Sequence, residues 1–138
     1  MNRYEIIEHT ADIGIKAYGE SLKDLFINAA YGMFDIIADL EGLKPGTSVK
    51  IELAAPNKEE LLIAWLDELL YHFYTKNIIF SEFNVVSMDS TSIKAEALGR
   101  HIGDKKSRLK TEIKAATYHN LKIEEKSGIY EVQVIFDV

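Results

Sequence analysis

The sequence contains no cysteine. This absence excludes disulfides, zinc–thiolate sites, iron–sulfur clusters and thiol nucleophiles together, and it fits a reducing compartment. A chain of 138 residues buries roughly 68% of the surface that its unfolded form exposes, so a hydrophobic core can hold it folded without covalent links. We therefore expect neither structural nor catalytic chemistry at a thiol.

Long apolar runs are also absent, because no stretch approaches the ~20 apolar residues that a membrane-spanning helix requires. The first residues do not form a basic segment followed by an apolar one, as a secretory signal would. There are only two prolines, and we find no internal repeat or linker. We expect one cytoplasmic domain covering residues 1–138, without a membrane contact, and no pattern sets its oligomeric state.

Basic residues are in the minority, with 16 Lys and Arg against 22 Asp and Glu, for a net charge of −6. This balance argues against a long nucleic-acid surface, because such surfaces depend on clustered Lys and Arg. One segment departs from it, since six basic residues against two acidic ones lie between Arg100 and Lys114. The segment could meet an acidic patch on a partner, contact RNA phosphate, or form a solvated loop.

Two amphipathic helices are predicted from the spacing of apolar residues. Ser21 is placed as an N-cap, and after it apolar residues recur every three or four positions from Leu22 to Ile37, with the helix ending near Asp39. Asn57, with Glu60 three residues later, caps a second helix whose apolar face runs through Phe73. Both stripes indicate helices that cover an apolar sheet face.

Strands are predicted where apolar and polar residues alternate. The expected strands are 4–8, 13–19 and 49–53, a hairpin containing Phe83, Val85 and 93–97, and a second hairpin from Leu121 to Lys126 and from Tyr130 to Phe136. The fold class is therefore α+β, with a mostly antiparallel sheet packed against two long helices in a single domain.

The final two residues bring two negative groups together, the carboxylate of Asp137 and the α-carboxylate of Val138. If the turn at Asp12 lies beside this strand end, three anions meet and repel unless a cation or a proton neutralises them. Oxygen ligands select Ca²⁺ or Mg²⁺, and Ca²⁺ tolerates irregular geometry better. The alternative is that Asp12 only caps a turn and the C-terminus is solvated.

Five segments, spread over the chain in order, resemble the archease family. They are the opening Tyr4-Glu-Ile-Ile-Glu-His-Thr-Ala-Asp-Ile13, Gly19-Glu-Ser-Leu22 with Asn28-Ala-Ala30 and Met33-Phe34, Ala64-Trp-Leu-Asp-Glu-Leu-Leu-Tyr71, Thr111-Glu-Ile-Lys-Ala-Ala-Thr-Tyr118, and Val134-Ile-Phe-Asp-Val138. They follow one another from Tyr4 to Val138, so the resemblance extends over essentially the whole sequence.

This resemblance implies an accessory protein of the RtcB-type, GTP-dependent RNA ligase, which seals tRNA exon halves and other cyclic-phosphate-ended RNA. It implies a protein that is not an enzyme itself, but promotes guanylylation and repeated turnover of the ligase. It also implies a divalent cation, Ca²⁺ more readily than Mg²⁺, bound by Asp12, Asp137 and the terminal carboxylate of Val138. An indirect contact with RNA is compatible with this role, and the sequence leaves open whether RNA is contacted directly.

Three further residues are candidates for a functional role. The resemblance gives Lys114 a contact with the ligase or its nucleotide, although a lysine there could also protect the edge of a sheet. His9 could orient Asp12 or be an ordinary turn histidine. Asp24 could belong to the partner surface, but its place in the first turn of a helix already explains it.

Two other functions are compatible with the sequence. Clustered carboxylates could hold catalytic Mg²⁺ in a metal-dependent phosphodiesterase or nuclease, but we find no second metal cluster and no evident general base. A chaperone-like module that binds other proteins would need a sizeable exposed apolar patch, whereas the apolar residues here fall on predicted core faces.

Overall fold

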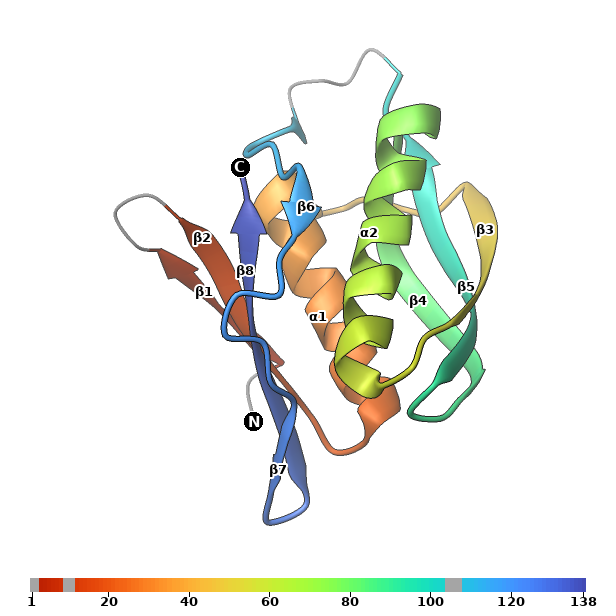
Figure 1. Cartoon of the computed structure of the whole chain (residues 1–138). Helices are drawn as coiled ribbons and strands as arrows, with labels where there is room; N and C mark the ends of the chain where they lie inside the picture. Colours follow the sequence, from red (N-terminus) through yellow and green to blue (C-terminus); the bar gives the residue numbers. More distant parts are fainter. Residues whose placement is uncertain (1–2, 9–11, 104–107) are drawn as a thin grey trace.

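The computed structural model describes residues 3–8, 12–103 and 108–138, and the description below concerns these. They form two long helices and eight strands, all paired antiparallel (Figure 1). In chain order the elements are β1 (Tyr4–Glu8), β2 (Ile13–Gly19), α1 (Leu22–Ile37), β3 (Thr47–Ala54), α2 (Lys58–Lys76), β4 (Ile78–Met88), β5 (Ser92–His101), β6 (Ala115–Ala116), β7 (Glu124–Lys126) and β8 (Ile129–Asp137). The predicted α+β class and both helices are confirmed. Neither helix is long and apolar enough to cross a membrane.

Both predicted N-caps are present. The hydroxyl of Ser21 accepts the backbone N–H of Asp24 at 3.1 Å. The side-chain oxygen of Asn57 accepts the N–H of Glu60 at 2.9 Å, and its amide nitrogen donates to the Glu60 carboxylate at 3.0 Å. These contacts satisfy N–H groups that have no partner within the helix, which is why each helix begins where it does.

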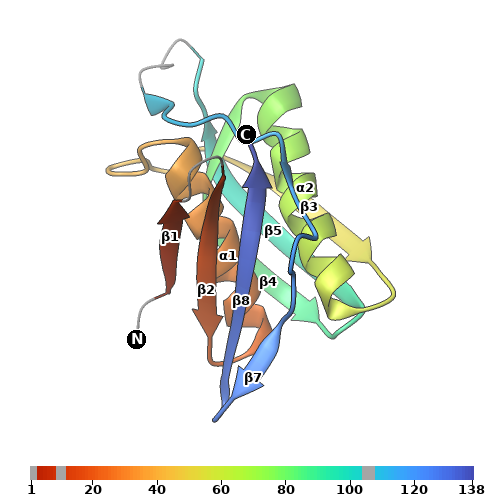
Figure 2. The same ribbon diagram turned by 60° about the vertical axis from the view of Figure 1, so that its left-hand side comes forward.

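The strands form two sheets, where the sequence alone suggested one. β1, β2, β8 and β6 lie in this order, with β7 also paired to β8, and β3, β5 and β4 form the second sheet. The helices lie between the two sheets (Figures 1 and 2). Because each sheet buries one face against this helical layer, alternation of apolar and polar residues was visible in both sheets, but the alternation does not say which strands pair.

The core fills the space between the helices and the two sheets. Phe26, Phe34 and Trp65 are fully buried, and the indole N–H of Trp65 donates to the carbonyl of Phe26 at 3.1 Å. This hydrogen bond joins α2 to α1 and satisfies a polar atom that would otherwise be buried without a partner.

Several predicted details differ from the structure. α1 ends at Ile37, two residues before Asp39, because Ala38 has extended backbone angles. The strand predicted from Leu121 is shorter, since β7 begins at Glu124. Lys114 lies just before β6 and is exposed, so it is not a residue of an edge strand. Short elements depend on tertiary contacts more than on local pattern, which explains these differences.

Gly14 allows β2 and β8 to approach closely. A Cβ atom at this position would lie 2.5 Å from the carbonyl oxygen of Val134 and 3.0 Å from Cδ1 of Ile135. The first neighbour belongs to the backbone and cannot move aside as the end of a side chain could. The pairing of β2 with β8 therefore depends on glycine at position 14.

We expect Gly14→Ala to destabilise the protein by about 3 kcal/mol, the upper end of the usual cost of overpacking. Urea unfolding followed by circular dichroism measures the change. Lys16→Ala is the control, because it alters the same strand at a partly exposed side chain. Equal stability of Gly14→Ala and the wild type would contradict the close approach described above.

Candidate functional site

The pairing of β2 with β8 brings Asp12 beside the end of the chain. Ile13 pairs with Phe136, so one step further along each chain Asp12 stands opposite Asp137. Residues that face each other in antiparallel strands have Cα atoms about 4.5–5.5 Å apart. Two of the three predicted carboxylates, with Val138 next in the chain, therefore lie at one end of the five-stranded sheet, where Figure 2 shows the C-terminus next to the start of β2.

The carboxylates lie on the outer side of this sheet. Phe136 is buried towards the helices, and successive side chains of a strand alternate between faces, so Asp137 points outward. Asp12 and Asp137 are exposed, and Val138 keeps 46% of its surface accessible. Among the described residues, no lysine, arginine or histidine forms an ion pair with either aspartate. Their negative charge is thus uncompensated within this part of the protein.

Lys114 lies on the other side of the same strand end. Its backbone N–H donates to the carbonyl oxygen of Asp137 at 2.7 Å, and the next residue, Ala115, pairs with Asp137 in β6. This contact fixes the backbone position of Lys114, whereas it does not involve the ammonium group of the exposed side chain. Asp12, Asp137 and Lys114 therefore come from three different segments that share one end of β8.

Side chains of α2 hold the segment that carries Lys114. The carboxylate of Asp67 accepts the N–H of Ala116 at 3.0 Å, and the hydroxyl of Tyr74 donates to the carbonyl of Ile113. The carboxylate of Glu59 accepts the N–H of Ile123 at 3.1 Å. These bonds fasten a stretch with little regular structure to the outer face of the helix.

Two of these anchors have altered acidity. Burial raises the pKa of the Asp67 carboxyl, and the hydrogen bond from Ala116 opposes this effect only in part. Burial, with the nearby charge of Glu112 as a smaller cause, also raises the pKa of the Tyr74 hydroxyl. Tyr74 thus stays protonated and keeps its role as donor well beyond neutral pH.

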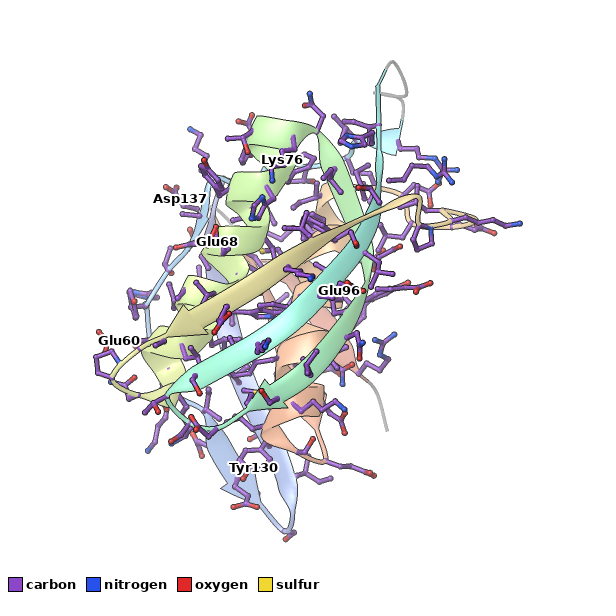
Figure 3. The ribbon with its side chains drawn as sticks, turned by 90° about the vertical axis from the view of Figure 1, so that its right-hand side faces the viewer. Glu60, Glu68, Lys76, Glu96, Tyr130 and Asp137 are labelled. Atoms are coloured by element: carbon purple, nitrogen blue, oxygen red, sulfur yellow. The ribbon has the colours of Figure 1, made fainter. Side chains whose placement is uncertain are left out.

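Two predicted residues are not brought into this cluster. Asp24 lies in the first turn of α1, which follows the far end of β2. β2 has seven residues, so at 3.3–3.4 Å per residue Asp24 is separated from Asp12 by about 20 Å. His9 lies outside the described residues. Figure 3 shows the two ends of β8, with Asp137 near Lys76 at the end of α2 and Tyr130 at the opposite end.

The comparison with known families covers nearly the entire sequence. The model of the Archease protein family matches residues 4–138. The chain belongs to the archease family. Its curated relatives include protein archease of Methanosarcina mazei, 40% identical over 140 residues that cover 99% of this chain and 96% of that protein. Protein archease of Sulfolobus acidocaldarius is 33% identical over 139 residues and covers all of both chains.

Solved structures of similar proteins share the fold. The solution structure of protein 1598 of Methanobacterium thermoautotrophicum superposes with a TM-score of 0.83, at 32% identity and with both chains fully covered. The crystal structure of an archease of Thermotoga maritima, described as a possible chaperone, gives a TM-score of 0.64 at 22% identity and covers 96% of this chain and 94% of that one. The second likeness concerns the fold alone.

Sequence reasoning missed the anchoring residues of this archease. Asp67 and Tyr74 lie off the apolar stripe of α2, yet both bind the backbone of the segment next to β8. A helix position that faces an irregular segment carries no periodic signal.

We expect Asp67→Asn to flatten the pH dependence of stability. The folded state raises the pKa of Asp67 above its ordinary value of 3.8, so its contribution to stability is greatest below that value and falls as the pH rises through the folded pKa. Asparagine keeps an oxygen that accepts from Ala116 but cannot ionise. In urea unfolding between about pH 4 and pH 7, the variant should therefore gain stability relative to the wild type as the pH rises.

Asp67→Ala is the matched control, because it removes the acceptor as well as the charge. Relative to Asp67→Asn it should cost about 1–2 kcal/mol at every pH, since neither variant ionises and the N–H of Ala116 loses its partner only in Asp67→Ala. A stability difference between Asp67→Asn and the wild type that does not change with pH would show that the carboxyl of Asp67 is not perturbed.

Proposed function

We propose that this archease is a cytoplasmic accessory factor of the RtcB-type, GTP-dependent RNA ligase. It promotes guanylylation and repeated turnover of the ligase in tRNA splicing and RNA repair, and it forms no bond itself. Membership of the archease family supports the partner. The observation that carries the proposal is the register of β2 and β8, which sets Asp12 opposite Asp137 beside the end of the chain.

The donor set at this position suits a hard divalent cation. Asp12, Asp137 and the α-carboxylate of Val138 offer only oxygen atoms, and their exposure leaves room for water molecules to complete a coordination shell. Within the described ranges, no three His, Asp or Glu side chains gather as metal ligands, so the site needs the α-carboxylate of Val138 as its third anion. Such an irregular, solvated set favours Ca²⁺ over Mg²⁺.

The role of the cation follows from the charges. Three carboxylates at this spacing repel one another and repel other anions, and a divalent ion compensates most of that charge. With the cation bound, this end of the sheet can approach the metal centre of the ligase and its anionic nucleotide. Lys114, anchored by its N–H to Asp137, supplies a positive group at the same edge for contact with the ligase or its nucleotide.

Asp137→Asn should reduce both Ca²⁺ binding and the stimulation of ligase guanylylation, each by at least about tenfold, because it removes a charged ligand. Isothermal titration measures the first, and transfer of labelled guanylate to the ligase the second. Glu125→Gln is the control, since it makes the same change in charge on β7, at the other end of β8. One glycine added after Val138 tests the α-carboxylate, whereas an N-terminal tag should be harmless. Undiminished stimulation by Asp137→Asn would remove this site from the mechanism.

The protein alone should release no fragments from RNA in the presence of Mg²⁺. An accessory factor has no turnover of its own, whereas a metal-dependent nuclease would degrade the strand without the ligase. Gel electrophoresis of an end-labelled RNA distinguishes the two. Cleavage that persists in the wild type and is lost in Asp137→Asn would replace the accessory role with a catalytic one.

A further inference from the structure

A basic hollow lies between the loop after α1 and the end of β5. Its volume is about 210 Å³, and four of the residues that line it carry or can carry positive charge. These residues are Lys44, Arg100, His101 and Arg108. Because the whole chain has a net charge of −6, a hollow lined in this way is a strong local reversal of charge.

Backbone carbonyl groups hold both arginines in place. Nε of Arg100 donates to the carbonyl of Lys44, and one terminal nitrogen of Arg108 donates to the carbonyls of Asp39 at 3.1 Å and Glu41 at 2.9 Å. A carbonyl group orients a guanidinium without neutralising it. Each arginine keeps further N–H donors, because a guanidinium carries five.

Carboxylates do not compensate this charge in the described part of the chain. The ion pairs there involve other cations, such as Lys16, Lys110 and Lys126, and none includes an arginine or Lys44. The nearby carboxylate of Asp39 is turned to its own loop, where it accepts the N–H of Glu41 at 3.0 Å. The two arginines are therefore held by backbone carbonyls and, among the described residues, are not paired with a carboxylate, so they can bind an external anion.

His101 lines the hollow with a ring that is held by a hydrogen bond. Its Nδ1 lies 2.9 Å from the carbonyl oxygen of Lys76, the last residue of α2, and only a protonated nitrogen can donate there. Nδ1 therefore carries the proton in the neutral ring. Nε2 is then the acceptor of the ring and remains for a second partner.

We propose that this hollow binds a phosphate group of an RNA strand. Guanidinium groups fit phosphate oxygens through pairs of N–H donors, and a lysine adds a point charge. The described residues that line the hollow include no tyrosine, phenylalanine or tryptophan, and their cationic groups suit a backbone phosphate as the ligand. The choice of RNA rests on the proposed function, whereas the anion site itself does not.

The hollow and the carboxylate cluster lie at the same end of the molecule. Arg108 is six residues before Lys114, whose N–H binds Asp137, so the connecting chain spans at most about 20 Å. Figure 1 shows the ends of α1, α2, β5 and β8 on this side of the protein. An RNA strand bound at the hollow would therefore pass close to the proposed cation site.

Binding of a short single-stranded RNA without terminal phosphates tests the proposal, with Ca²⁺ removed by a chelator and no ligase present. Fluorescence anisotropy is measured over a series of salt concentrations. Lys44→Glu should weaken binding at least about fivefold and reduce the slope of log K against log salt by about 1. Lys23→Glu, which makes the same change in charge in the first turn of α1, should stay within about twofold of the wild type.

Nuclear magnetic resonance identifies the position and the ligand. Inorganic phosphate should shift the backbone amide signals of Lys44, Arg100 and His101 in the full chain, and RNA should shift the same signals. Equal losses in Lys44→Glu and Lys23→Glu would overturn the proposal. So would an acidic peptide that moves these signals where phosphate does not, or GTP that binds where RNA does not. Because this test is made without Ca²⁺ and without the ligase, failure of the proposed cation site leaves it intact.

Discussion

The pairing of β2 with β8 is the contact on which the rest of the structure depends. It joins residues 13–19 to residues 130–136, so the first and last parts of the chain form adjacent strands in the middle of one sheet. The buried faces of these two strands, with Ile15, Ala17, Val132 and Val134, pack towards the helical layer. A slip of one residue would turn these side chains outward and move Asp12 away from Asp137. The core and the candidate site are therefore specified by the same register.

Contacts on both sides of β8 hold its end in place. β2 supports it on one side through a regular ladder, and on the other side it is supported by the irregular segment that α2 fastens through Asp67 and Tyr74. Thr117 contributes as well, because its N–H and its hydroxyl both donate to the carbonyl of Ile135. The chain end is thus held at a defined position although its last side chains are exposed.

The local parts of this fold could be predicted from the sequence. The stripe from Leu22 to Ile37 and the caps at Ser21 and Asn57 depend on neighbours three or four residues away, and the structure contains all of them. The division into two sheets could not be predicted, because alternation assigns a face to each side chain but no partner to a strand. The support of Lys114 could not be predicted either, since it depends on Asp67, 47 residues earlier in the sequence.

The candidate site could be predicted from the sequence even less than the fold, because it depends on contacts between distant segments. The sequence placed two carboxylates together only at Asp137 and Val138, where the chain itself connects them, and the position of Asp12 depended on a strand pairing across 124 residues. The basic segment was visible as composition, yet the residues that line the hollow include Lys44, which lies 56 residues before Arg100 and is joined to it through a backbone carbonyl. Charge counted along the chain identifies the sign of a surface. The shape that lets such a surface hold one anion is determined by which loops the fold brings together.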